Sequence, residues 1–231
     1  MRFVFKETTG STNADALALP DGEDRVAIVA RRQTGGRGRM GRLWISPEGN
    51  LYVSYAVRVD SPATASRYSF IAAVALAQAF ERIGLSPRCK WPNDVLLDGK
   101  KAAGILLETN GKDRLVAGIG VNLASAPAGK VLYPTAAVAD FGITCSPDDF
   151  LPILTERFEA LEKSSFADVL SAWKERAYGI GSAVRVNLPE KTVEGIFYGL
   201  DNDGVLLLKC GNEIKRITAG DVFFGPSEKR V

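Results

Sequence analysis

A segment rich in glycine and arginine, residues 31–42, is the part of this sequence best suited to bind an anion. It holds five arginines and four glycines, and no acidic residue. Glycine lets backbone N–H groups come close to a ligand, and a guanidinium group makes charge-assisted hydrogen bonds with phosphate or carboxylate oxygens. We therefore expect an irregular loop that binds an anionic ligand, rather than a packed helix or strand.

Other interpretations of this segment also fit part of its pattern. Residues 36–41 match the pattern G-x-G-x-x-G of dinucleotide-binding loops, but that pattern must open a helix. Here Pro47 and Gly49 follow, and then a strand, so we reject a dinucleotide site. Arginine–glycine segments also bind RNA, and basic runs are often only solvated surface. On this segment alone, both of these alternatives stay open.

A second cluster, residues 90–94, reads Lys-Trp-Pro-Asn-Asp and stands directly before a hairpin signal at Asp98-Gly99. The hairpin returns Lys100 and Lys101 to the same edge, where a buried lysine could anchor a carboxylate. Each member of the cluster also has a structural interpretation. The tryptophan fits a core position, the Asn-Asp pair fits an ordinary turn, and both lysines fit an exposed edge.

The composition excludes several kinds of chemistry. The chain has 231 residues, of which 46% are hydrophobic, and it has no histidine, which rules out Ser-His-Asp and Cys-His catalysis and histidine-bound metals. The net charge of +2 is too small for a general polyanion binder. Cys89, Cys145 and Cys210 are far apart and lack CxxC spacing, so we expect three buried thiols rather than disulfides or a zinc site.

The sequence also bears on where the protein works. No apolar run reaches the roughly 18 residues that span a membrane, and the first residues lack the apolar stretch of a secretion signal. We therefore expect a cytoplasmic protein that does not bind a membrane.

The hydrophobic pattern predicts the elements that must hold the two clusters. Apolar residues that alternate predict strands, and apolar residues spaced by three or four predict helices. The strands expected in the first part of the chain are residues 3–7, 26–31, 51–59, 94–97, 101–109 and 114–121, the last three as an antiparallel meander. The expected helices are residues 13–19, 66–83, 148–163 and 166–177.

The pattern changes at residues 179–181, Gly-Ile-Gly, and we place a domain boundary there. Short strands are expected after it, at residues 183–188, 193–200, 205–208 and 213–218, as in a small barrel. The sequence therefore predicts a larger domain over residues 1–181 and a smaller one over residues 182–231.

Taken together, the motifs resemble one known family. Residues 36–44 (GRGRMGRLW), 90–94 (KWPND) and 101–105 (KAAGI) follow one another in the order and at the separations found in biotin protein ligases. Residues 11–13 (STN) and 118–123 (GIGVNL) match further motifs of that family. The resemblance covers nearly the whole chain, because the strands after residue 183 are similar to the family's SH3-like C-terminal domain.

The resemblance implies an α+β fold, in which helices cover a mixed or antiparallel sheet like that of class II aminoacyl-tRNA synthetases, with a small C-terminal SH3-like β-barrel. It also implies an activity. Such ligases activate biotin with ATP as biotinyl-5'-AMP, transfer biotin to a lysine of a carrier protein, and release AMP and pyrophosphate. Biotin and ATP are then the substrates, with Mg²⁺ as the metal ion.

This reaction brings two anions together, since the biotin carboxylate attacks the α-phosphorus of ATP, so the site must neutralise charge. We assign Arg39 and Lys101 to the biotin carboxylate and the α-phosphate, and Lys90 to the phosphate. They act as electrostatic stabilisers and not as bases, because a carboxylate needs no deprotonation. Asp94 is the expected Mg²⁺ ligand, with an ordinary turn residue as its alternative.

The resemblance also implies the binding residues. Those expected for biotin are Ser11, Thr12, Asn13, Gln33, Gly36, Arg37, Gly38, Arg39, Lys101 and Gly104. Those expected for ATP or the adenylate are Arg37, Arg39, Arg42, Trp44, Lys90, Asn93 and Asn122. Residues 11–13 fit a helix cap equally well, and Trp44 fits a packing position.

We further expect the glycine–arginine segment to be disordered when the site is empty and to close over the adenylate, because it has no hydrophobic anchor. The expected partner is a biotin carboxyl carrier protein or domain, of the acetyl-CoA or pyruvate carboxylase type, and homodimers are common in the family. The first expected strand begins at Phe3, which indicates the type that lacks an N-terminal DNA-binding domain. The alternatives are a lipoate or octanoate ligase and, from another class, an RNA-binding module.

Overall fold

The computed structural model describes residues 1–127 and 133–224. In this part of the chain, a large mixed sheet contains seven strands: β1 (Arg2–Thr9), β2 (Val26–Gln33), β3 (Leu51–Arg58), β4 (Pro87–Lys90), β5 (Asp94–Leu97), β6 (Lys100–Thr109) and β7 (Arg114–Val121). Their order across the sheet is β1-β2-β3-β7-β6-β5-β4. Strands β1 and β2 are parallel, and the other neighbours pair antiparallel. This confirms the expected α+β fold.

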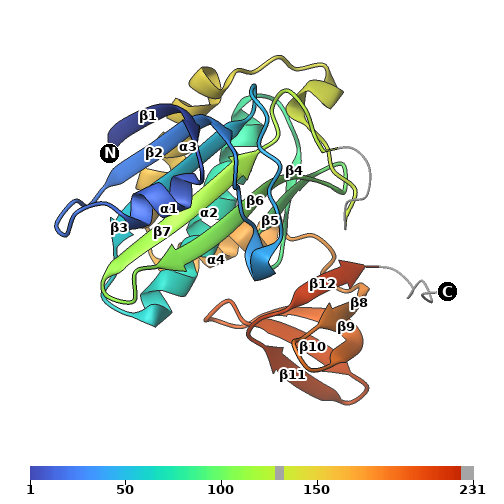
Figure 1. Cartoon of the computed structure of the whole chain (residues 1–231). Helices are drawn as coiled ribbons and strands as arrows, with labels where there is room; N and C mark the ends of the chain where they lie inside the picture. The colour runs from blue at the N-terminus through green and yellow to red at the C-terminus, as the bar shows by residue number, and fades with distance from the viewer. Residues whose placement is uncertain (128–132, 225–231) are drawn as a thin grey trace.

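Helices cover this sheet unequally. They are α1 (Thr12–Leu17), α2 (Pro62–Arg82), α3 (Pro147–Glu162) and α4 (Phe166–Glu175), with short 3₁₀ turns η1 (Arg39–Gly41) and η2 (Val138–Phe141). Helices α2, α3 and α4 lie on one face and α1 lies on the other (Figure 1). Serine side chains cap the N-termini of α1, α3 and α4 by accepting a backbone N–H, which explains where these helices begin.

The alternation along the strands separates the main core from the open face of the sheet. On β3, Val53 and Tyr55 point into the core beneath α2 and α3, whereas Ser54 points to the opposite face. On β7, Ile119 belongs to that core, and Gly118 lines a cavity on the other face. The short helix α1 covers only part of this second face, so the rest of it is free to form a site.

A second, smaller sheet follows the helices. It is antiparallel and contains β8 (Ala183–Asn187), β9 (Thr192–Leu200), β10 (Leu206–Cys210), β11 (Glu213–Ile217) and β12 (Asp221–Phe224), in the order β11-β10-β9-β8-β12. It stands to one side of the large sheet (Figure 1). The expected small C-terminal β-structure is confirmed, and the exact domain boundary at residue 181 stays a prediction.

Several expectations need correction. Residues 31–33 are not part of an irregular loop, because β2 continues through them and pairs with β1 as far as Thr9 and Gln33. Strands β4 and β12 were not expected, since each has only four residues and pairs at the edge of its sheet. Cys89 is buried as expected, but Cys145 and Cys210 are partly exposed, and all three thiols are free.

Among the described helices, none is both long and apolar enough to cross a membrane.

Candidate active site

A cavity of about 480 Å³ opens on the second face of the large sheet. Its walls come from α1, the glycine–arginine loop (residues 34–42), the β4–β6 region, β7 and β12. Most of the expected site residues line it: Ser11, Thr12, Asn13, Gln33, Arg37, Gly38, Arg39, Arg42, Trp44, Lys90, Asn93, Asp94, Lys101 and Gly104. Segments far apart in the sequence therefore meet at one place.

Glycines on two neighbouring strands form the floor of the cavity beneath Trp44. Gly104 of β6 and Gly120 of β7 are direct partners in the sheet. A Cβ atom at Gly120 would lie 2.4 Å from Trp44 Nε1, and one at Gly104 would lie 3.0 Å from Trp44 Cζ3. The indole can approach the sheet this closely only because both positions lack a side chain. A third glycine, Gly118, leaves the same kind of room for Asn13.

The arginines of the loop turn towards the cavity, where protein acceptors hold them. Arg39 donates to Asn93 Oδ1 at 3.2 Å and to the carbonyl oxygen of Gly220 at 3.2 Å. Arg42 pairs with the Asp221 carboxylate at 3.0 Å. Gly220 and Asp221 lie at the start of β12, so the small sheet supplies part of this wall of the cavity. Since these arginines are engaged in a cavity, the structure does not favour a solvated surface loop.

The two lysines of the site have different surroundings. Lys101 Nζ lies 2.6 Å from Asp94 Oδ1 and 5.3 Å from the centre of the Trp44 ring. Lys90 is buried, with its Nζ 3.7 Å from the centre of the Tyr133 ring. Burial lowers the pKa of Lys90 to about 8, although the nearby carboxylate of Asp94 opposes this shift. The positive charge of Lys90 is therefore only weakly balanced by nearby carboxylates, so its ammonium group is available to bind an anion.

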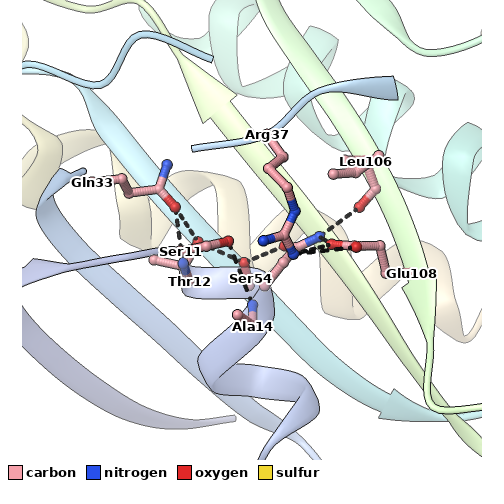
Figure 2. Close-up of polar contacts among 9 residues, drawn as sticks. Ser11, Thr12, Ala14, Gln33, Arg37, Ser54, Leu106 and Glu108 are labelled. Carbon is pink, nitrogen blue, oxygen red and sulfur yellow. Dashed lines mark hydrogen bonds and ion pairs between the residues drawn. The ribbon is translucent and has the colours of Figure 1, made fainter. Parts of the chain in front are cut away.

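One end of the cavity is rich in uncharged polar groups, and its charged residue Arg37 is paired with Glu108 (Figure 2). Ser11 is the N-cap of α1 and accepts the N–H of Ala14. Gln33 Oε1 accepts the backbone N–H and the hydroxyl of Thr12, at 2.9 and 3.1 Å. The capping interpretation of residues 11–13 is thus correct for Ser11, and the same turn also faces the cavity.

Asn13 uses both of its donor hydrogens within the protein. Its Nδ2 donates to Glu108 Oε2 at 2.7 Å and to the carbonyl oxygen of Leu106 at 3.3 Å, and its Oδ1 accepts the Ser54 hydroxyl at 2.6 Å. An amide has two donor hydrogens, and both are used here. Asn13 therefore shapes the cavity wall more than it offers hydrogen bonds to a ligand.

The glycine–arginine loop has a defined path in this structure. Gly38 N–H donates to the carbonyl oxygen of Arg42 at 2.7 Å, and Met40 and Gly41 adopt positive φ angles of 55° and 71° to complete the turn. We expected this loop to lack a hydrophobic anchor, and Met40 and Leu43 are indeed exposed. Its anchors are polar instead, through Arg39 and Arg42, and the sequence pattern did not reveal them. Disorder of the empty loop remains a prediction.

Two expected site residues do not line the cavity. Gly36 is a packing position, because a Cβ there would lie 2.5 Å from the carbonyl oxygen of Trp44. Asn122 is buried, and its Nδ2 donates to the carbonyl oxygen of Ala136 at 3.1 Å. Its backbone N–H donates to Ala102, next to Lys101. Both residues support their neighbours and lie outside the cavity wall.

The structural interpretations of the second cluster prove partly correct. Trp91 is a core residue, and its Nε1 also donates to the carbonyl oxygen of Gly204 in the small sheet's β9–β10 turn. Asn93 Nδ2 donates to the carbonyl oxygen of Ile105 at 2.6 Å, which holds the hairpin together. Its Oδ1 accepts a hydrogen bond from Arg39. Lys100 is exposed, whereas Lys101 faces the cavity.

Four residues in or beside the cavity were not predicted from the sequence: Tyr133 and Asp221, which line it, and Ser54 and Glu108, which bond to Asn13 behind its wall. Ser54 carried a signal, because it is a polar residue between the apolar Val53 and Tyr55, and Glu108 carried a weaker one, because it follows the apolar residues 105–107. Tyr133 and Asp221 carried no such signal. Tyr133 lies between β7 and η2, outside any expected element, and Asp221 begins β12, a strand that was not expected.

The side chains that could bind a metal ion limit the kind of metal site that is possible here. In the described parts of the chain, no group of three or more His, Cys, Asp or Glu residues could hold a metal ion. Two carboxylates line the cavity: Asp94, which pairs with Lys101, and Asp221, which pairs with Arg42. Mg²⁺ often takes one or two carboxylates and completes its shell with water and phosphate. The site therefore fits a Mg²⁺ ion that arrives with a phosphate ligand, and not an ion held by protein groups alone.

Comparisons with known proteins agree on one family. The profile of the biotin/lipoate A/B protein ligase family matches residues 2–123, and that of the biotin protein ligase C terminal domain matches residues 179–225. A biotin–acetyl-CoA-carboxylase ligase of Paracoccus denitrificans is 39% identical over 94% of this chain and 98% of its own length. One from Mycobacterium tuberculosis is 35% identical, over 93% of this chain and 85% of its own.

A solved structure shows the same fold. The biotin protein ligase from Aquifex aeolicus in complex with biotin and ATP superposes with a TM-score of 0.84 at 25% identity, covering 98% of this chain and 99% of that one.

The glycine floor leads to a stability prediction. In Gly120→Ala, the new Cβ would lie 2.4 Å from Trp44 Nε1, so the indole must shift. We expect this variant to lose about 1–3 kcal/mol of unfolding free energy, as overpacked positions do, and to show an altered near-UV circular dichroism signal. Gly10→Ala is the control, because its Cβ would meet nothing within 4 Å. Equal unfolding curves for the two variants would contradict the prediction.

Proposed function

This chain belongs to the biotin/lipoate A/B protein ligase family, and on that premise we propose how its cavity performs the reaction. The protein is a biotin protein ligase. It activates biotin with ATP as biotinyl-5'-AMP and transfers biotin to a lysine of a biotin carboxyl carrier protein. The lipoate ligase alternative is not favoured, because the named relatives and the superposed structure are biotin ligases.

The observation that carries the mechanism is the convergence of cations on one cavity. Arg37, Arg39, Arg42, Lys90 and Lys101 all line it. The reaction joins a carboxylate to a polyphosphate, so repulsion between the two anions is the main obstacle to their approach. Fixed cations in a partly buried cavity offset that repulsion.

We assign the cations to the reacting groups by their surroundings. Arg39 and Lys101 face the biotin carboxylate and the α-phosphate, and Lys90 faces the phosphate. In this structure Lys101 pairs with Asp94, and Arg39 is held by Asn93 and by the small sheet. These contacts keep the cations oriented before the ligand arrives. No base is required, since the attacking carboxylate is already ionised.

The end of the cavity lined by Ser11, Thr12 and Gln33 is the proposed site of the biotin ring. The ureido group of biotin has one carbonyl and two N–H groups, which the polar groups of Ser11, Thr12 and Gln33 can match. Arg37 and the backbone of Gly38 close this end from the loop side. Asn13 acts through its neighbours, because the protein already uses its amide.

Trp44 marks the proposed adenine side. Its ring lies over the glycine floor of β6 and β7, and it offers an aromatic surface for stacking. Arg42 and Asn93 complete the proposed nucleotide side of the wall. We revise the role of Asn122 from adenylate binding to support of the segment that carries Lys101, because it bonds to backbone groups beside that lysine.

Asp94 is the proposed Mg²⁺ ligand. When bound with ATP, the ion would neutralise charge on the phosphate oxygens. Asp94 would then share its charge between the ion and Lys101, which lies 2.6 Å away.

The finer identity of the partner is also a proposal. The named relatives support a carrier of the acetyl-CoA carboxylase type over one of the pyruvate carboxylase type. A homodimer and a cytoplasmic location stay predictions.

Pyrophosphate exchange tests the function directly. With biotin, the purified protein should exchange labelled pyrophosphate into ATP, because adenylate formation is reversible. Lipoate or octanoate, offered singly at the same concentration, should support little exchange. Exchange with lipoate or octanoate but not with biotin would contradict the assignment, and so would strong salt-sensitive binding of single-stranded RNA without any exchange.

The role of Lys101 predicts a specific loss. Lys101→Gln keeps a hydrogen-bond donor for Asp94 but removes the positive charge, so the fold should persist while the transition state loses a stabilising cation. We expect kcat/KM for biotin in the exchange assay to fall by on the order of 10²–10³-fold. Lys100→Gln is the matched control, because Lys100 is exposed and does not line the cavity. Equal rates for the two variants would remove Lys101 from the mechanism.

The lowered pKa of Lys90 predicts a pH dependence. Its ammonium group loses a proton as the pH rises through about 8, whereas an ordinary lysine stays charged to above pH 10. Since kcat/KM reports the free enzyme, kcat/KM for ATP should fall with an apparent pKa of about 8.

The Lys90→Arg variant provides the check, because arginine keeps its charge over this range. Its kcat/KM for ATP should be flat between pH 7 and pH 9.5, whatever its absolute value. The same decline in both proteins would assign the titration to another group.

A further inference from the structure

Glu108 joins three parts of the biotin end of the cavity, and neither the charge neutralisation nor the ring contacts require it. It lies near the end of β6, and its side chain is partly buried, with 28% exposed. Its Oε2 accepts from Asn13 of α1 at 2.7 Å, and its Oε1 lies 3.3 Å from Arg37 NH2 of the loop. Figure 2 shows Arg37 reaching down from the loop to this carboxylate.

The contacts of Arg37 differ from those of the other two loop arginines that line the cavity. Arg39 and Arg42 are held by the small sheet, through Gly220 and Asp221. Arg37 is held from the large sheet, by Glu108. The loop is therefore fixed at two points, and each point can be altered without touching the other.

A carboxylate is chemically suited to this place. The ring of biotin is neutral, so a negative charge near it repels nothing, whereas the same charge beside the phosphates would oppose the reaction. Glu108 also balances the charge of Arg37, which leaves this end of the cavity without net charge. The nitrogen NH2 of Arg37 lies 3.3 and 3.5 Å from the two carboxylate oxygens of Glu108, so the ion pair holds this end of the guanidinium group beside β6.

We propose that Glu108 is a positioning residue of the biotin site, which orients Arg37 over the ring and fixes the direction of the Asn13 amide. This inference rests on the proposed function of the cavity. Glu108 acts before any chemistry, so it sets biotin affinity and has little effect on the rate of adenylate formation.

Glu108→Gln isolates the contact with Arg37. The glutamine has the same shape, and its oxygen can still accept from Asn13, but the ion pair is lost. We expect the Kd for labelled biotin, measured by equilibrium dialysis without ATP, to rise about threefold to tenfold, as for the loss of one hydrogen bond. In pyrophosphate exchange, the KM for biotin should rise by the same factor, while kcat and the KM for ATP stay within about twofold, the scatter of such comparisons.

A double-mutant cycle tests whether Glu108 affects biotin binding through Arg37. Arg37→Met alone should weaken biotin binding, and adding Glu108→Gln to it should change the Kd by less than about twofold, because the partner is already gone. Glu108→Leu removes both contacts and should weaken binding more than Glu108→Gln. Independent, multiplying effects of Arg37→Met and Glu108→Gln would overturn the proposed route.

Glu81→Gln is the matched control. Glu81 also pairs with an arginine, Arg176, at 2.7 Å, but this pair joins α2 to the end of α4 outside the cavity. Its loss should leave the Kd for biotin unchanged. An unchanged Kd in Glu108→Gln as well would overturn the proposal. If the wild-type protein binds no biotin and supports no exchange with it, the proposed function fails first, so the two failures are distinguishable.

Discussion

Positive charge gathered in one cavity is the constraint on which the rest of this structure depends. Such groups repel one another, so most of them pair with an acceptor while no ligand is bound, whereas Lys90 lies against the Tyr133 ring. The fold supplies these acceptors from separate elements: Glu108 of β6 for Arg37, Asp94 of β5 for Lys101, and Asp221 of β12 for Arg42. The small C-terminal sheet thereby completes the site instead of merely following it, since its carbonyl and carboxylate oxygens hold two arginines of the loop.

Close approach is the second requirement. The Trp44 indole lies directly on the large sheet, so the sheet has to lack side chains beneath it. Gly104 and Gly120 are paired across β6 and β7, and Trp44 lies over both. This explains in physical terms why two motifs, one on each strand, carry glycine between apolar residues. The core on the opposite face keeps these strands in place beneath α2.

The sequence alone predicted the motifs and most of the strands and helices correctly, because periodicity and turn residues are local signals. The resemblance to biotin protein ligases predicted that Lys101 and Arg39 share one site, and both line the same cavity. Prediction from the sequence failed where the determinant is a contact between distant residues. Asp221 and Tyr133 reach the site from segments with no pattern of their own, and Asn122 belongs to a matching motif but points its amide at backbone groups. Edge strands β4 and β12 are too short for periodicity to detect.

The most direct test of charge neutralisation by this cavity is a crystal structure with biotinyl-5'-AMP bound. If the cations serve the two reacting anions, the acyl-phosphate oxygens will lie within hydrogen-bond distance of Arg39 and Lys101, and the biotin ring will lie beside Gln33 and Arg37. If Arg39 keeps only Asn93 and Gly220 as partners and Lys101 keeps only Asp94, while the phosphate lies elsewhere, these cations do not serve the reacting anions and the proposed mechanism is wrong.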